Sequence, residues 1–260
     1  MIYVTGDCHG NFRRFTKKQL NKLPFILTEN DYVIICGDFG LLWNKKDKEF
    51  EYNCKWLSSL PFTILFCEGN HEGFDLLLEY PVETWHGGKV HHIVKDKIIH
   101  LMRGQVFDIE GKTFFTMGGA SSYDIQGGIL DKDSPTYISD RKRAIKSGLL
   151  YRVNHYSWWK EELPTKEELE EGRKNLRSVD YKVDYVIAHC MSGSMQNDLE
   201  KYYQFSGRHF ATDVLTDFFD EIEKELKFKK FYCGHYHEEL ELDAFHTIMY
   251  EKIMPVDLLR

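Results

Sequence analysis

The sequence predicts an α/β fold, a four-layer α/β/β/α sandwich in which two mixed β-sheets pack face to face with helices outside. Three observations predict it. Short apolar runs end abruptly in Gly, Asp, Asn or His, helix-like stretches lie between them, and the middle of the chain alternates apolar and polar residues. Continuous apolar runs are typical of strands buried on both faces, and alternation is typical of antiparallel hairpins. We expect one domain over residues 1–260.

The strands are predicted where β-branched and aromatic residues cluster before a turn signal. These segments are 2–7, 32–38, 63–71, 184–189 and 230–237. The hairpins are predicted within 91–119, where Glu110-Gly111 marks a turn.

Helices are predicted where apolar residues recur with a period near 3.6. One covers 11–23, and another covers 213–226 with Asp213 as its N-cap. A charged run at 165–176 indicates a solvated surface helix. That run ends the least regular part of the chain, about 121–180, which we expect to be an insert or lid.

The composition restricts the class of protein. Charged residues make up 29% and the formal net charge is -7, which indicates a globular protein and counts against a surface built to hold nucleic acid. No apolar run is long enough to span a bilayer and no secretory signal is visible, so we expect no membrane partner. The six cysteines are scattered without a C-x-x-C pair, as expected for reduced thiols of a cytoplasmic protein.

Metal-ligand residue types gather at the ends of the predicted strands. The seven candidate ligands are Asp7, His9, Asp38, Asn70, His189, His235 and His237. The carboxyl ends of parallel strands meet at one edge of a sheet, so these side chains are expected to converge. Oxygen and nitrogen ligands without thiolates suit Mn, Fe, Zn or similar ions. Seven ligands exceed the need of one tetrahedral ion and suit two divalent ions that share a carboxylate, the arrangement used in phosphate ester hydrolysis.

These residues stand in an ordered set of motifs. They read D-C-H at 7–9, G-D at 37–38, G-N-H-E at 69–72, a single His189, and G-H-Y-H at 234–237. In this the sequence resembles the calcineurin-like metallophosphoesterases. The resemblance implies that the chain is a metal-dependent phosphoric ester hydrolase with two bound metal ions, Mn being favoured.

The resemblance also implies a role for each residue. Asp7, His9 and His237 would hold the first ion, and Asn70, His189 and His235 the second. Asp38 would bridge both ions. His71 would be the catalytic residue, stabilising the transition state or protonating the leaving oxygen. A hydroxide bridging the ions would attack the phosphorus.

Departures from the family pattern bear on the substrate. The second motif continues as GDFGLLW at 37–43, without the second Asp and the Arg found in the protein phosphatases of the family. The stretches GGASSYD at 118–124 and SWWKEELP at 157–164 resemble those of a bacterial and phage subgroup. The predicted function is hydrolysis of phosphomonoester or phosphodiester bonds of a nucleotide or other small molecule. Alternatives are a nuclease or nucleic-acid end phosphatase, a protein phosphatase, and a non-catalytic metal-binding module.

The irregular segment supplies the candidate substrate-binding residues. Arg152 can clamp phosphate oxygens, and Tyr151 and Trp158 offer flat faces for a nucleobase. The tryptophans could instead anchor the segment to the core. A nucleic-acid substrate would need a basic patch such as the one around Arg141 and Arg143, and the acidic balance counts against it. No pattern indicates an oligomeric state.

Overall fold

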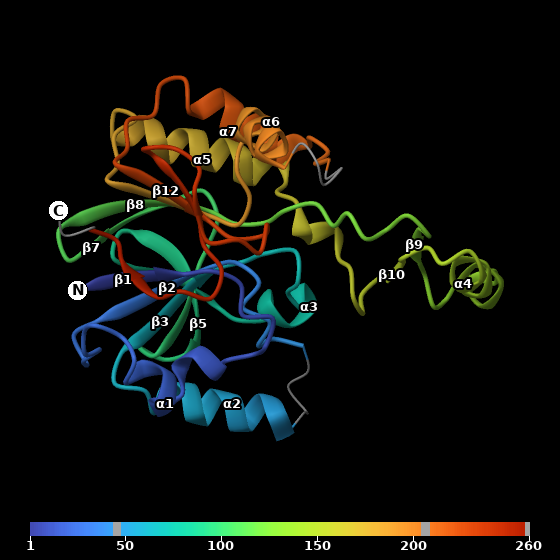
Figure 1. The fold of residues 1–260 in the computed structure, drawn as a ribbon, viewed down its shortest axis with the longest axis horizontal. Coiled ribbons are helices and arrows are strands. Elements are labelled where there is room, and N and C mark those ends of the chain that lie inside the picture. Colours follow the sequence, from blue (N-terminus) through green and yellow to red (C-terminus); the bar gives the residue numbers. More distant parts are fainter. Residues whose placement is uncertain (44–47, 204–208, 258–260) are drawn as a thin grey trace.

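Two large sheets form the centre of the molecule (Figure 1). The computed structural model describes residues 1–43, 48–203 and 209–257. Within these ranges the first sheet has seven strands in the order β15-β1-β2-β3-β6-β5-β4. They are β1 (Ile2–Thr5), β2 (Tyr32–Cys36), β3 (Thr63–Cys67), β4 (Val82–Trp85), β5 (Gly88–Val94), β6 (Ile98–Leu101) and β15 (Met254–Pro255). The central strands β1, β2, β3 and β6 run parallel, and the β1–β15, β4–β5 and β5–β6 pairs are antiparallel.

The second sheet is also mixed and has six strands in the described residues, in the order β13-β14-β12-β11-β8-β7. They are β7 (Gln105–Ile109), β8 (Lys112–Met117), β11 (Tyr185–Ala188), β12 (Lys230–Cys233), β13 (Leu240–Glu241) and β14 (His246–Ile248). Strands β8, β11, β12 and β14 are parallel, and the outer pairs β7–β8 and β13–β14 are antiparallel.

The predicted hairpins are confirmed, but they belong to different sheets. Strands β5 and β6 pair in the first sheet, and β7 and β8 pair in the second. The chain crosses between the sheets at 102–104, where Gly104 has a φ of 74°. The β7–β8 turn lies at Glu110 and Gly111, whose φ values of 54° and 72° are left-handed.

Alternating side chains of the strands build separate cores on the two faces of each sheet. In β2, Ile34 and Cys36 face the core between the sheets, and Val33 and Ile35 face the core on the outer side of the first sheet. A third core covers the outer face of the second sheet and contains Val186 of β11. Strands buried on both faces explain why their sequences are continuously apolar.

Helices complete the four layers (Figure 1). The short 3-10 helix η1 (Arg13–Phe15), α1 (Lys17–Leu20) and α2 (Lys48–Ser58) cover the first sheet. Three helices cover the second sheet: α5 (Lys166–Ser178), α6 (Gly193–Tyr202) and α7 (Val214–Ile222). The predicted α/β/β/α sandwich is therefore confirmed. None of the described helices is both long and apolar enough to cross a bilayer.

The predicted helices differ in detail from the observed ones. Residues 11–23 form two short turns instead of one helix, because Thr16 is extended with a ψ of 147° and its hydroxyl donates to the carbonyl of Arg13 at 2.8 Å. Asp213 caps α7 as predicted, accepting from the N–H groups of Leu215 and Thr216. The charged helix α5 has a buried face toward the second sheet.

An arm of residues 121–163 projects from one end of the sandwich (Figure 1). It contains β9 (Ile129–Leu130), α4 (Tyr137–Lys146), β10 (Arg152–Val153) and the 3-10 helix η2 (Lys160–Glu162). The two short strands pair in parallel and α4 lies at the far end. Trp159 is buried in the core of the first sheet and fixes the base of the arm. The irregular part of the chain is thus this arm, since 166–178 is the regular helix α5.

Candidate metal centre

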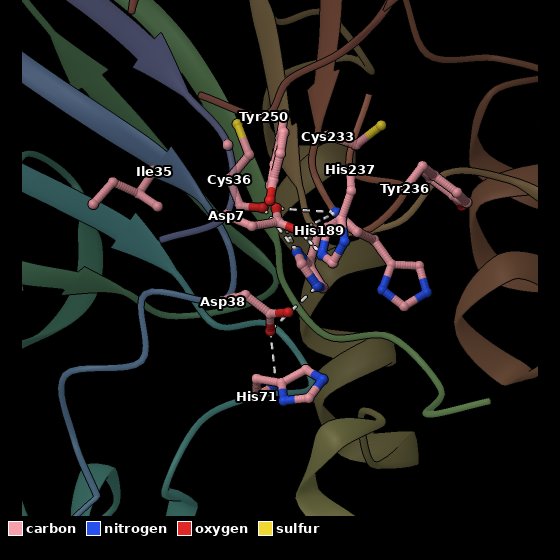
Figure 2. Close-up of polar contacts among 12 residues, drawn as sticks. Asp7, Ile35, Cys36, Asp38, His71, His189, Cys233, Tyr236, His237 and Tyr250 are labelled. Atoms are coloured by element: carbon pink, nitrogen blue, oxygen red, sulfur yellow. Dashed lines mark hydrogen bonds and ion pairs between the residues drawn. The ribbon is translucent and has the colours of Figure 1, made fainter. Parts of the chain in front are cut away.

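Each of the seven candidate ligands follows the carboxyl end of a parallel strand. Asp7 and His9 follow β1, Asp38 follows β2, Asn70 follows β3, His189 follows β11, and His235 and His237 follow β12. The strand ends of both sheets meet at one edge of the sandwich, and Figure 2 shows several of these side chains gathered there. Residues from the whole length of the chain thereby reach one site.

Asp7, His9 and His237 bring their ligand atoms together at one side of the site. The Nε2 atoms of His9 and His237 lie 2.9 Å apart, and His237 Nε2 lies 3.1 Å from Asp7 Oδ2. We refer to these three residues as the first ligand set. His9 and His237 are partly exposed and Asp7 is buried, so this side of the site opens toward solvent.

Asp38, Asn70 and His189 form a second, buried ligand set. His189 Nε2 lies 3.3 Å from Asp38 Oδ1 and 3.2 Å from Asn70 Oδ1. The other ring nitrogen of His189 donates to the carbonyl oxygen of Cys36 at 2.8 Å, which aims Nε2 at the oxygen atoms. Asp38 Oδ2 lies 3.6 Å from His9 Nε2, so Asp38 stands between the two sets.

His235 lies beside the second set without completing it. It is buried, and its ring centroid is 5.0 Å from that of His189. Its backbone N–H donates to both carboxylate oxygens of Asp7 at 3.0 Å. Among the described residues, the groups of three converging His, Cys, Asp or Glu side chains do not include it. The structure thus brings six predicted ligands into direct proximity and places the seventh next to them.

His71 reaches the site from the loop after β3. Its backbone N–H donates to Asp38 Oδ1 at 2.7 Å (Figure 2). Its ring centroid is 5.0 Å from that of His9. Its Nε2 lies 3.0 Å from Nη2 of Arg152 in the arm. His71 therefore faces the space between the ligand sets and the arm.

The backbone is held in a left-handed conformation at four of the predicted ligands. The φ values are 48° for His9, 49° for Asp38, 69° for His235 and 55° for His237. Such conformations are unfavourable for residues other than glycine and concentrate at functional sites. The N–H groups of Cys8 and His9 both donate to the carbonyl of Asp38, at 2.9 and 2.8 Å, which locks two of these loops together.

Buried charges shift the pKa values of the site. Burial alone would raise the pKa of Asp38, but the facing imidazole of His189 outweighs it and holds that pKa well below its usual range. Burial would lower the pKa of His189, but Asp38 and Asp7 raise it to about 9. Burial lowers the pKa of His71 and brings that of His235 far down. The Asp38 carboxylate is thus ionised, as a metal ligand must be.

Side chains behind the ligands hold the loops in place, and sequence patterns did not reveal them. Arg14 donates to the carbonyls of Asp7, Gly6 and Tyr250. Glu72 accepts from the N–H groups of Phe39 and Gly40 at 2.7 and 3.2 Å, and burial together with Asp38 raises its pKa to about 8. Glu72 is the last residue of the G-N-H-E motif, which is the one sequence feature that points to it. Arg14 belongs to none of the motifs.

The amide of Asn70 is oriented from the arm. Asn70 Nδ2 donates to Ser122 Oγ at 3.1 Å, and Ser122 Oγ donates to Glu162 at 2.7 Å. With its NH₂ group engaged in this way, Asn70 presents its carbonyl oxygen to His189. Ser122 and Glu162, which orient Asn70 in this way, were not among the predicted site residues.

The three predicted substrate-binding residues have different surroundings. Arg152 contacts His71 and pairs with Asp124 at 2.8 Å. Tyr151 accepts a hydrogen bond at 2.9 Å from Arg141 of α4, the helix at the far end of the arm (Figure 1). Trp158 is half-buried at the base of the arm, beside the core residue Trp159. Of the three, Arg152 is the one whose polar contact reaches a predicted site residue.

Carboxylate, amide and imidazole groups, which gather here at converging strand ends, are ligand types that metal-dependent hydrolases use. The chain belongs to the calcineurin-like phosphoesterase family, whose family model matches residues 1–239. It is thus a phosphoesterase of a family that uses divalent metal ions. Among the described residues, three overlapping groups of side chains could hold such ions: Asp7, His9 and His237; His9, Asp38 and His71; and Asp7, Asp38 and His189.

Among solved structures, the chain is similar to the phosphopantetheinyl hydrolase of Mycobacterium tuberculosis, with 14% identity and a TM-score of 0.43 over 95% of this chain and 87% of that one. No curated protein sequence matches the chain.

Proposed function

We propose that the chain uses two divalent metal ions, Mn being favoured, to hydrolyse phosphomonoester or phosphodiester bonds of a nucleotide or other small molecule. Asp7, His9 and His237 would hold one ion, and Asn70, His189 and His235 the other. Asp38 would bridge them. When bound, two such ions supply positive charge to the phosphoryl oxygens and lower the pKa of water.

One observation carries this proposal: Asp38 lies between the two ligand sets. One of its oxygens is 3.3 Å from His189 Nε2 and the other is 3.6 Å from His9 Nε2. A single carboxylate that faces both groups of imidazoles fits a bridging ligand.

The residues present fit two cations. The Nε2 atoms of His9 and His237 lie 2.9 Å apart beside the Asp7 carboxylate, a contact that is unfavourable unless a proton or a cation lies between the two nitrogens. A Cβ at Gly69 would overlap Asp38 Oδ1, and a Cβ at Gly234 would overlap Asp7 Oδ1. Glycine at these two positions lets the carboxylates lie against the backbone of the neighbouring loops.

His71 would act on the leaving group. Its backbone N–H is tied to Asp38, and its ring converges with the side chains of His9 and Asp38. In this position it could donate a proton to the departing oxygen atom or stabilise charge on the phosphoryl group. Arg152, 3.0 Å from His71 Nε2, would hold a phosphoryl oxygen on the same side.

The proposal is tested by a substrate panel after reconstitution with Mn. The panel contains an aryl phosphomonoester, an aryl phosphodiester, 2′,3′- and 3′,5′-cyclic nucleotides, dinucleotides and short RNA. Turnover of small esters that is lost with chelator and regained with Mn supports the proposal. Activity confined to RNA would favour the nuclease alternative, and two bound ions without turnover of any ester would favour a non-catalytic module.

A further inference from the structure

A cavity of about 530 Å³ opens beside the first ligand set. Asp7 and His9 form its inner end. Its sides come from the segment around η1 and α1 and from the segment that follows β14. A phosphoester whose reacting group lies at the ligand sets would have this space open for the rest of the molecule.

The cavity is rich in positive charge, although the whole chain has a net charge of -7. Arg13, Lys22 and Lys252 are exposed on its walls, and none of them has an ion-pair partner among residues 1–43, 48–203 and 209–257. Glu251 is the acidic wall residue outside the ligand set. Three unpaired cations beside one carboxylate leave an excess of positive charge in the cavity.

Arg14 also lines this cavity, but its guanidinium contacts the protein backbone. Its guanidinium is engaged by the carbonyls of Gly6, Asp7 and Tyr250, so it ties the two walls together. Tyr250 stacks on the ring of His237 with centroids 5.0 Å apart and planes at 24° (Figure 2). The lining of the cavity therefore includes a flat aromatic ring that contacts the first ligand set, as well as the three cations.

A second cavity borders His9 from the other side. It is smaller, about 210 Å³, and is lined by Trp43, Phe50 and Glu49. Among the residues that the structure describes, its lining includes no lysine or arginine. The larger cavity is lined both by members of the first ligand set and by side chains suited to a further anionic group.

We propose that the larger cavity binds a second phosphate group of the substrate. This rests on the proposed function, because one phosphate would react at the ligand sets while Arg13, Lys22 and Lys252 hold the other. The natural substrate is then a small molecule with two phosphate groups, such as a nucleoside bisphosphate or a dinucleotide with a terminal phosphate.

The test compares substrates that differ by one phosphate. If the chain hydrolyses monoesters, the pair is adenosine 3′,5′-bisphosphate against the adenosine 3′- and 5′-monophosphates. If it hydrolyses diesters, the pair is the dinucleotide pApA against ApA. The ratio of kcat/KM within the pair should be about tenfold or more, the effect of one additional charge-assisted hydrogen bond. This preference should weaken as salt rises, because exposed charges are screened.

Charge-removing variants locate the second phosphate. Arg13→Gln, Lys22→Gln and Lys252→Gln should each lower the ratio, and the triple variant should bring it close to one. Lys142→Gln removes the same charge from α4 and should leave the ratio unchanged. A wild-type ratio near one would overturn the proposal, as would a high ratio that persists in the triple variant.

Binding provides a readout that is independent of turnover. Calorimetric titration of the Mn-loaded protein should give a lower Kd for adenosine 3′,5′-bisphosphate than for the monophosphates, and the triple variant should remove the difference. Equal Kd values in the wild type would overturn the cavity proposal even if aryl phosphates are hydrolysed. Failure to hydrolyse any ester would instead contradict the proposed function, and the Kd comparison would still decide on the cavity.

Discussion

Arg152 Nη2 lies 3.0 Å from His71 Nε2, while Nε of the same guanidinium donates to Asp124 Oδ1 at 2.8 Å. Arginine has only donors, so His71 Nε2 is the acceptor in this contact and the ring proton lies on Nδ1. The motif after Asp38 lacks the Asp and the Arg that the protein phosphatases of the family have there. In this chain a guanidinium from the arm stands beside His71 instead.

We therefore expect Arg152→Gln to lower kcat/KM for an aryl phosphate by about 10- to 100-fold, the effect of losing a hydrogen bond between charged groups. Asp124→Asn should have a smaller effect in the same direction, because it loosens the guanidinium without removing it. Steady-state kinetics on Mn-loaded protein measure both. Arg141→Gln, farther out on the arm, is the control. Equal losses in Arg141→Gln and Arg152→Gln would refute a role specific to Arg152.

His71→Ala should lower kcat much more than it raises KM, because the group acts in the transition state. The loss should be about 100-fold or more for an alkyl ester, whose leaving oxygen needs a proton. It should shrink for an activated aryl ester, whose phenolate leaves unprotonated. A series of leaving groups with rising pKa measures this dependence. The same loss across the series would exclude proton donation by His71.

Asp38→Asn should abolish turnover and reduce the metal content clearly below two ions per chain, because the bridging charge is removed from both ligand sets. Elemental analysis of the Mn-reconstituted variant measures the loss. Asp75→Asn, a surface change in α3 (Phe74–Leu77), is the matched control and should keep both metal and rate. The bridging assignment is wrong if Asp38→Asn retains two ions and a near-native rate.

A buried histidine pair should make stability depend on pH. His91 Nδ1 lies 3.0 Å from His100 Nδ1, and His100 Nε2 lies 2.9 Å from Glu68 Oε2. Burial and then repulsion by His100 lower the pKa of His91 from 6.5 to about 4. Between these values the unfolded chain binds a proton that the folded chain does not, so the free energy of unfolding falls as the pH drops from 6.5 to about 4.

Through His91, the free energy of unfolding falls by up to about 3 kcal/mol by the low end of this pH range. Urea unfolding at pH 7 and at pH 4.5 measures it as the difference between the parent and His91→Gln. The parent should lose more stability on acidification than the variant does. His86→Gln, at an exposed position, should behave as the parent does. If both variants track the parent, His91 is not the group responsible.

The strands and most of the site could be predicted because their signals are local. At β2, a continuous apolar run predicts the strand, and Gly37-Asp38 directly after it indicates both the turn and the candidate ligand. Parallel strands place such ends at one edge, so convergence followed from topology. The crossing of the chain at 102–104 could not be predicted, because alternation shows that residues form hairpins and does not show which sheet receives each one.

The supporting side chains could not be predicted for a related reason. Arg14 lies within the segment 11–23 that was predicted to be a helix, yet it bonds to the carbonyl of Tyr250, which is 236 residues away. Asp124 and Arg152 lie on an arm without periodicity, so the contact of Arg152 with His71 depends on how the arm folds back. Such contacts depend on tertiary packing, which the local pattern of residue types does not predict.

Asp38 is proposed to join two metal ions held by residues from both sheets. Anomalous diffraction from crystals of the Mn-loaded protein would locate these ions. Two Mn peaks are predicted on either side of the Asp38 carboxylate, one against Asp7, His9 and His237 and the other against Asn70, His189 and His235. A single peak, or two peaks of which neither contacts Asp38, would contradict the claim.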